Sequence, residues 1–159
     1  LLNLVRRDEA VQELIDLGVE NALSTSDADW QQKAREMMGK AGATSAIDSV
    51  GGDVSADLVE LLGLDGELIV FGTATGAPMP LSSGSLIMKH ITVKGFWGSR
   101  VSSEMGPDER KRLITELVTL TATGKLALED GGVFSINQIS AALKAALTPG
   151  RTGKVMISG

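Results

Sequence analysis

The chain has 159 residues, a net charge of −5 and an apolar content of 43%, which is enough for a buried core. Nucleic-acid-binding domains usually carry a basic surface, and a membrane span needs roughly 18 apolar residues in a row, so we expect no nucleic-acid partner and no membrane partner. The chain has no cysteine and a single histidine, His90, which excludes disulfides and a thiolate or multi-histidine zinc site within it.

Short apolar runs alternate with helical patterns over the first two thirds of the chain. The expected strands cover 1–5, 20–24, 44–50 and 66–72, and the expected helices between them cover 8–18, 26–40 and 52–62. Ser26 or Asp27 is the expected cap of the second helix, and Trp30, Met37 and Met38 are expected to face the core. Such alternation predicts a parallel α/β sheet wrapped by helices, with right-handed crossovers.

The pattern changes after the fourth strand. Gly, Pro, Ser and Thr dominate residues 73–85, which predicts a loop, and residues 91–97 restore a strand pattern. A helix is expected from Pro107 to its stop at Gly124, because proline favours the first turn and glycine the end. The last residues, with a helix at 136–147 and a strand at 153–158, look like a different domain. We therefore divide the chain into 1–125 and 126–159.

The residues that directly follow the expected strands are the first candidates for a binding site. In doubly wound sheets, ligands lie beyond the carboxyl ends of the strands. Val50 and Gly51 follow the third strand, and Gly72 and Thr73 follow the fourth. Glycines there allow a ligand to approach the backbone, and the amides that open the next helix favour an anion. The alternative is that these glycines only make tight turns.

Arg6, Arg7 and Asp8 follow the first strand, just where a helix is expected to begin. The positive end of a helix dipole repels cations, so arginines at this place suggest that an anion binds there. In a dinucleotide-binding sheet, an arginine at the end of the second strand can accommodate the 2′-phosphate of NADP. The alternative is a solvated arginine pair that bridges to Asp8 and Glu9 and contributes under about 1 kcal/mol per pair.

Five segments span nearly the whole chain: "NLVRRDE", "AIDSVGG", "GELIVFGTATGAPMPL", "SLIMKHITVKGFWGS" and "GKVMIS". Together they resemble the C-terminal half of the medium-chain dehydrogenase/reductase superfamily. Within it the chain is most similar to the mitochondrial-type enoyl thioester reductases, which reduce trans-2-enoyl-CoA or acyl-carrier-protein with NADPH, and to the zinc-free quinone oxidoreductases. The resemblance implies an NADPH-dependent, zinc-independent oxidoreductase of fatty acid metabolism, in the cytoplasm or alternatively in the mitochondrial matrix.

The resemblance also assigns roles to single residues. It implies that Arg6, Arg7 and Asp8 surround the 2′-phosphate and that Lys154 reaches the cofactor. The remaining residues that it implies along the cofactor or the acyl pocket are Phe71, Gly72, Thr73, Ala74, Phe96, Trp97, Gly98 and Ser99. Val50 and Gly51 are cofactor-binding candidates from their place after the third strand. Trp97 would line the substrate pocket. The alternatives are that Trp97 packs the domain cleft, that Phe71 and Phe96 are packing residues, and that Lys154 is an ordinary surface lysine.

Two features of the family are missing from the sequence. There is no G-x-G-x-x-G turn, and there is no tyrosine, whereas the family's proton-donating tyrosine lies in its N-terminal catalytic domain. We therefore expect the tail of a longer protein: a Rossmann-type sheet without its first strand, plus a C-terminal segment that returns to the catalytic domain. This predicts a gap, or a strand supplied from elsewhere, between the strands at 1–5 and 44–50.

The expected activity of the whole protein is reduction of the C=C bond of enoyl thioesters, and quinone or alkenal reduction is the alternative. The chain by itself is expected to lack catalytic residues and to be inactive. A third hypothesis is that it is a nucleotide-binding module without catalysis. The resemblance further implies a homodimer that pairs through the strand at 91–96.

Overall fold

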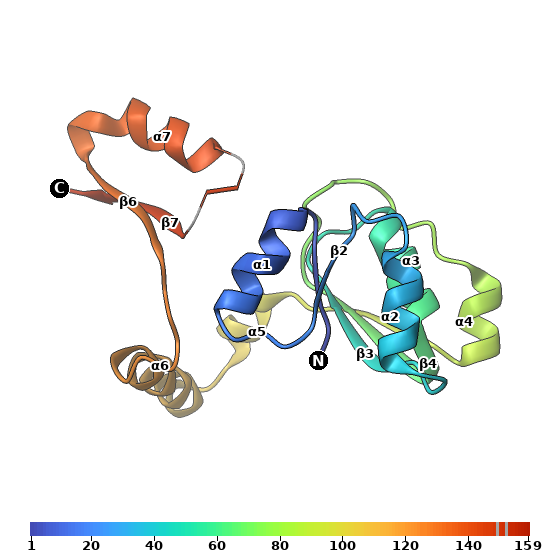
Figure 1. Cartoon of the computed structure of the whole chain (residues 1–159). Coiled ribbons are helices and arrows are strands. Elements are labelled where there is room, and N and C mark those ends of the chain that lie inside the picture. Colours follow the sequence, from blue (N-terminus) through green and yellow to red (C-terminus); the bar gives the residue numbers. More distant parts are fainter. Residues whose placement is uncertain (149, 152) are drawn as a thin grey trace. The chain divides into compact units, whose positions relative to one another are not determined.

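The computed structural model describes residues 1–148, 150–151 and 153–159 (Figure 1). The chain divides into two compact units, which we call unit 1 (Leu1–Ser99) and unit 2 (Arg100–Gly159). The division into functional domains at 125/126 stays a prediction.

Unit 1 alternates strands and helices, as the hydrophobic pattern predicts. Its strands are β1 (Asn3–Val5), β2 (Ala22–Ser24), β3 (Ala43–Asp48), β4 (Leu62–Val70) and β5 (Thr92–Gly95). Its helices are α1 (Asp8–Asp16), α2 (Trp30–Met38), α3 (Asp53–Leu61) and α4 (Ser83–Lys89), and α5 (Gly98–Glu104) begins at its end.

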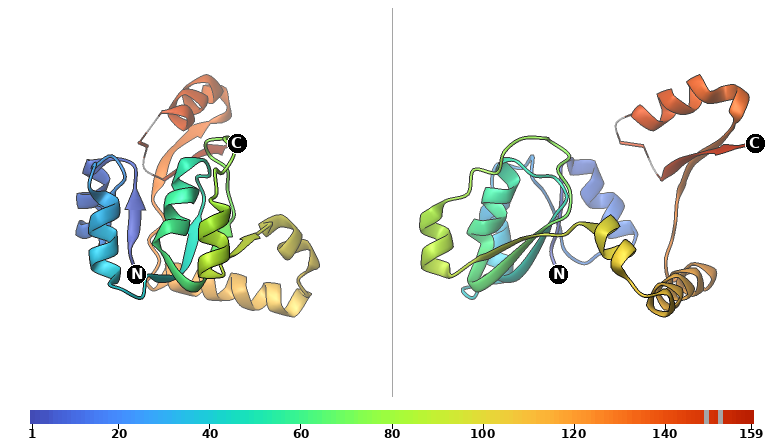
Figure 2. Two further views of the ribbon diagram at one scale, coloured as in Figure 1. Left: turned by 90° about the vertical axis from the view of Figure 1, so that its right-hand side faces the viewer. Right: turned by 180° about the vertical axis from the view of Figure 1, so that it is seen from behind.

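The strands of unit 1 form two parallel sheets. β1 pairs with β2, and β3, β4 and β5 form a three-stranded sheet with β4 in the centre. Every residue of unit 1 is described, and β1 and β3 share no ladder. The two sheets therefore hold the second to sixth strands of a doubly wound sheet, and the predicted gap at the first strand is confirmed. Figures 1 and 2 show β1 and β3 running in the same direction, so their carboxyl ends lie at one edge.

Two small cores hold unit 1 together. Trp30 and Ala34 of α2 are buried with Leu61, and Met38 packs beside them. These α2 residues are four positions apart and form one helix face, whereas Met37 lies off that face and is 48% exposed, so its predicted burial is wrong. The second core centres on Val59, Leu62 and Leu68, with α3 and α4 over one face of the sheet.

The other face of the three-stranded sheet is open within unit 1. Neighbouring residues of a strand point to opposite faces, and in β3 Ala46 packs on the core while Ile47 is 69% exposed. In β4, Leu68 is fully buried and Phe71, just past the strand, is 55% exposed. The face of the sheet that carries Ile47 and Phe71 is therefore open within unit 1.

Three local predictions differ from the structure. α4 occupies the end of the predicted loop at 73–85, since the Ser82 hydroxyl accepts the N–H of Ser85 at 3.2 Å and caps the helix. Residues 98–104, for which no helix was predicted, form α5. α2 begins at Trp30, later than its predicted caps, because Asp27 Oδ1 accepts the N–H of Asp29 and forms a local turn instead.

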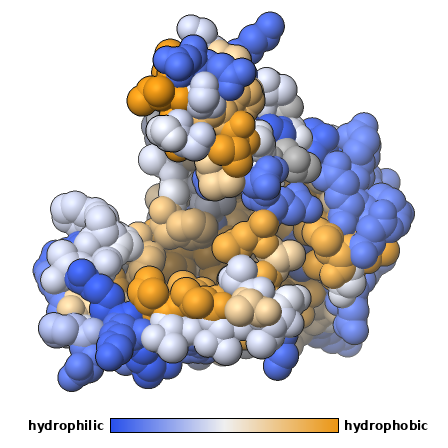
Figure 3. Space-filling model, turned by 90° about the vertical axis from the view of Figure 1, so that its left-hand side faces the viewer, coloured by the Kyte–Doolittle hydropathy of each residue, from blue (hydrophilic) through white to orange (hydrophobic). Residues whose placement is uncertain are grey.

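Unit 2 contains α6 (Pro107–Ala122), β6 (Asp130–Ser135), a 3₁₀ turn η1 (Ile136–Gln138), α7 (Ile139–Leu147) and β7 (Lys154–Ser158). β6 and β7 are parallel, and α7 connects them. Pro107 opens α6 as predicted, and Gly124 follows it with a φ of +70°. Large hydrophobic side chains stay exposed on both helices, among them Ile114 and Leu117 of α6 and Leu143 of α7, and such surface is visible in Figure 3.

No helix in the described part of the chain is long and apolar enough to cross a membrane.

Candidate functional site

A buried carboxylate organises the turn after β3. Asp48 is 2% exposed, and its Oδ1 accepts the backbone N–H of Val50 at 2.7 Å and of Gly51 at 3.1 Å. Its Oδ2 accepts the hydroxyl of Ser55, which is itself fully buried, at 2.6 Å. Sequence reasoning missed Asp48 as a site residue. The available signal was an aspartate directly before a Ser-Val-Gly-Gly turn, because aspartate commonly accepts amides two or three residues ahead.

The turn after β3 is bonded to the loop after β4. The Ser49 carbonyl accepts the N–H of Ala74 at 3.4 Å. The Val50 carbonyl accepts both the N–H of Thr75 at 3.0 Å and its hydroxyl at 3.1 Å. The structure therefore places Val50 and Gly51 beside Thr73, Ala74 and Thr75, the last of which was not among the predicted residues. That these residues form a binding site stays a prediction.

The glycines of this edge have specific backbone roles. Gly51 has a φ of +74°, and a Cβ on Gly72 would lie 2.5 Å from the Ser49 carbonyl oxygen. Both observations are what tight turns require, and both leave the backbone at this edge without a side chain. The amides of Val50 and Gly51 already bond to Asp48, so they are not free for an anion. Anion binding by the amides that open α3 stays a prediction.

Three aromatic side chains lie exposed just after the ends of β4 and β5. Phe71 and Phe96 follow Val70 and Gly95, which are paired in the sheet, so the two rings start from neighbouring strand ends. Trp97 is 69% exposed and Phe96 is 48% exposed. Phe71, Phe96 and Trp97 therefore do not serve as core packing residues within unit 1. Gly98 and Ser99 follow at once and begin α5.

The three charged residues after β1, Arg6, Arg7 and Asp8, differ in their side-chain contacts. Arg7 Nη2 lies 3.6 Å from Glu13 Oε2, so Arg7 does not make the bridge to Asp8 and Glu9 that the alternative interpretation required. The Asp8 carboxylate accepts the hydroxyl of Ser26 at 2.9 Å, and hydrogen bonds from Ser24 and Ser26 hold its pKa below the usual range.

Arg6 is exposed at the same edge, and its side chain has no hydrogen bond or ion pair within residues 1–148, 150–151 and 153–159. It is therefore the member of the charged segment whose guanidinium is available to an anion. Lys154 begins β7 in unit 2 and is exposed.

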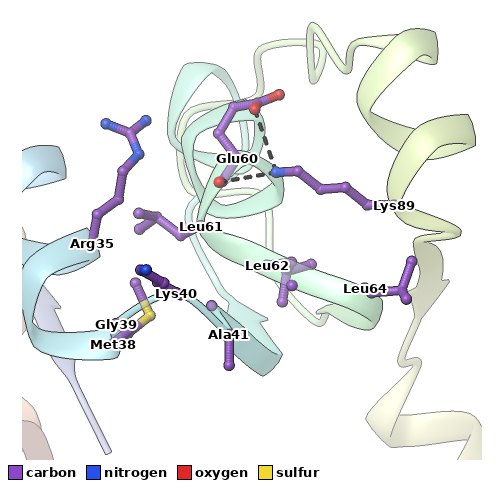
Figure 4. Close-up of a pocket in the computed structure, with 12 residues that line it drawn as sticks. Arg35, Met38, Gly39, Lys40, Ala41, Glu60, Leu61, Leu62, Leu64 and Lys89 are labelled. Carbon is purple, nitrogen blue, oxygen red and sulfur yellow. Dashed lines mark hydrogen bonds and ion pairs between the residues drawn. The ribbon is translucent and has the colours of Figure 1, made fainter.

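A hollow lies elsewhere in unit 1, on the edge where the strands begin. It has a volume of about 490 Å³ between the ends of α2 and α3 and the start of β4, and no predicted site residue lines it (Figure 4). In it, Lys89 Nζ donates to the Val59 and Glu60 carbonyls at 3.3 and 3.0 Å, which satisfies the end of α3. The Ser85 hydroxyl, and then Lys89, lower the pKa of Glu60.

The family model described as zinc-binding dehydrogenase matches residues 3–118, which cover both sheets of unit 1 and most of α6. The chain belongs to the zinc-binding dehydrogenase family. It corresponds to the C-terminal half of the medium-chain dehydrogenase/reductase superfamily, as the sequence resemblance implied.

The relatives of the chain include a quinone oxidoreductase-like protein and an enoyl-[acyl-carrier-protein] reductase. The chain is 26% identical over 151 residues to quinone oxidoreductase-like protein 2 of Rattus norvegicus, covering 95% of the chain and 43% of that protein. It is 26% identical over 161 residues to the mitochondrial enoyl-[acyl-carrier-protein] reductase of Homo sapiens, covering 99% and 43%. The chain thus spans less than half the length of these relatives.

Solved structures share the fold. A candidate NADPH:quinone reductase of Bacillus thuringiensis superposes with a TM-score of 0.86 at 21% identity, over 100% of this chain and 48% of that one. A quinone oxidoreductase of Pseudomonas syringae gives 0.76 at 20% identity, over 100% and 49%. The predicted α/β fold of Rossmann type is therefore confirmed.

The family description names zinc, but the residues present do not fit a zinc site. The described parts of the chain hold no group of three or more His, Cys, Asp or Glu side chains that could bind a metal ion. His90 is exposed, and its Nδ1 lies 2.6 Å from Asp65 Oδ1. Zinc independence of the whole protein stays a prediction.

Proposed function

We propose that the chain is the cofactor-binding half of an NADPH-dependent reductase that acts on the C=C bond of trans-2-enoyl thioesters. The observation that carries the cofactor part is the exposed Arg6 at the end of β1, which has no partner in the described residues. β1 corresponds to the second strand of a doubly wound sheet, where an arginine selects the 2′-phosphate of NADP. Similarity to the human mitochondrial enoyl-[acyl-carrier-protein] reductase supports the substrate part.

The residues of this chain would hold and orient the cofactor. Arg6 would bind the 2′-phosphate, with Arg7 and Asp8 beside it, and Lys154 would also contact the cofactor. Val50, Gly51 and residues 71–74 would lie along it, and residues 96–99 would line the pocket for nicotinamide and substrate. When bound, NADPH supplies the hydride. The chain has no tyrosine, so we assign the proton donor to another part of the whole protein and no catalytic residue to this chain.

The glycine positions support this fit. The positive φ of Gly51 and the close approach of Gly72 to Ser49 leave backbone, without side chains, at the edge where the strands end. Such an edge admits a ligand close to the main chain.

Quinone or alkenal reduction is the second candidate, because quinone oxidoreductase-like protein 2 matches the chain equally well. Steady-state NADPH oxidation by the full-length protein, with crotonyl-CoA and with a quinone in parallel assays, decides between them. We expect the higher kcat/KM with crotonyl-CoA, and a clear preference for the quinone would contradict the proposal.

A non-catalytic nucleotide-binding role is the third candidate for the chain by itself. Calorimetry with NADPH separates the cases: we expect tight binding by the full-length protein and weak or no binding by residues 1–159. Tight binding by a full-length protein that reduces neither substrate would favour the binding module.

We also propose a homodimer that forms through the strand at 91–96. In unit 1, β5 is an edge strand with β4 as its one partner, so its other side is free to extend the sheet. The cytoplasm is the proposed compartment and the mitochondrial matrix the alternative, to which the name of the human relative gives support.

A further inference from the structure

Asp48 is a buried charge with a specific set of partners. Its three donors are the amides of Val50 and Gly51 and the hydroxyl of Ser55, and no salt bridge joins it to a cation in the described part of the chain. Burying a carboxylate is unfavourable unless hydrogen bonds satisfy it, and bonds to a charged acceptor are short and strong. The carboxylate therefore fixes the backbone of the turn more firmly than a neutral side chain would.

Hydrogen bonds connect Asp48, through Val50, to the loop that follows β4. Val50 donates its N–H to Asp48 and accepts both the N–H and the hydroxyl of Thr75 with its carbonyl. The Thr75 hydroxyl in turn accepts the N–H of Ala77 at 3.2 Å. One side chain thus orders the segments that follow β3 and β4.

We propose that Asp48 is a positioning residue of the nucleotide site, which holds the 49–52 turn and the 73–75 loop in the shape that receives the cofactor. This rests on the proposed function. Asp48 itself is too buried to touch a ligand, so it acts through Val50, Gly51 and Thr75.

The test compares Asp48→Ala, Asp48→Asn and Ser55→Ala in the full-length protein, with Asp65→Asn as a control at the other edge of the sheet. Asp48→Ala should raise the KM and Kd for NADPH about tenfold or more, since two amides lose a charged acceptor, and leave kcat at saturation within about twofold. Asparagine keeps an oxygen for both amides, so Asp48→Asn should restore affinity to within about threefold. Asp65→Asn should change neither constant.

Hydrogen exchange of the Val50, Gly51 and Thr75 amides gives a readout that needs no ligand. We expect faster exchange at all three amides in Asp48→Ala, and at Val50 and Gly51 in Ser55→Ala.

A lower melting temperature with unchanged NADPH affinity and unchanged exchange at Thr75 would show a purely structural role and overturn the proposal. Should Asp48→Ala fail to fold, unchanged exchange in Ser55→Ala overturns it as well. If the unmutated protein binds no NADPH, the proposed function fails, and the exchange result still decides whether Asp48 positions both loops.

Discussion

Gly72 lies directly against the carbonyl of Ser49, with no room between them for a side chain. A Cβ on Gly72 would stand 2.5 Å from the Ser49 oxygen and 3.1 Å from its carbonyl carbon. The two residues follow β4 and β3, so this contact sets how closely the two loops of the candidate site approach each other.

Gly72→Ala should therefore separate these loops. Overpacking of this kind costs about 1–3 kcal/mol, and we expect a lower urea midpoint together with weaker NADPH binding by the full-length protein. Gly95→Ala is the matched control, because Gly95 also ends a strand of this sheet but has open space around the position of a Cβ. Equal effects of the two substitutions would show that the Ser49 contact is unimportant.

The two arginines after β1 should differ in their effect on cofactor choice. Arg6→Ala should raise the KM for NADPH about tenfold or more and leave the KM for NADH nearly unchanged, since it removes a charge-assisted contact to a phosphate that NADH lacks. Arg7→Ala is the control with the same change of charge, and its effect should be smaller because Arg7 is turned toward Glu13. Steady-state kinetics with both cofactors measures this. Equal losses with NADPH and NADH in Arg6→Ala would contradict the phosphate assignment.

Sequence reasoning succeeded where a periodic pattern decides the structure. Helical spacing located α2 and α3, and the proline and glycine at the two ends of α6 fixed its limits. It failed at α4, a seven-residue helix whose start depends on one serine cap that resembles the surrounding loop.

Some residues of the candidate site were predictable from the sequence, and others were not. The strand ends identified Val50, Gly51 and Gly72, because position along a strand is readable from the chain. Asp48 was missed although the turn that follows it is a local signal for its bonds to two amides. Its contact with the fully buried Ser55 appears only when β3 and α3 pack together.

Two carboxylates on α3 should shift stability in opposite directions at neutral pH. Burial, with a smaller effect of the nearby Asp53, raises the pKa of Asp57, whose Oδ1 accepts from Gln31 at 2.6 Å. Its protonated form is thus favoured in the folded state, and this stabilisation is lost as pH rises through the folded pKa. Asp57→Asn keeps the acceptor without the charge and should raise the melting temperature at pH 7 relative to the unmutated chain.

Glu60→Gln is the opposite case. The Ser85 hydroxyl and Lys89 lower the pKa of Glu60, so its contribution is present above the unfolded value and lost as pH falls through the folded pKa. Glu60→Gln should therefore lower the melting temperature at pH 7 and have little effect at pH 3. Melting curves of both variants at the two pH values test this, and shifts of the same sign at pH 7 would contradict it.

The edge of β3 that faces away from β4 should accept a further parallel strand in the full-length protein. Within unit 1 this edge has no strand partner, although β3 belongs to the interior of a doubly wound sheet. Unpaired strand amides exchange rapidly, so the β3 amides that do not donate to β4 should exchange fast in residues 1–159 and slowly in the full-length protein. The amides of β4, which is paired on both sides, are the control and should be protected in both. Fast exchange along β3 in the full-length protein would show that no strand occupies the gap, and the sheet would then be divided there permanently.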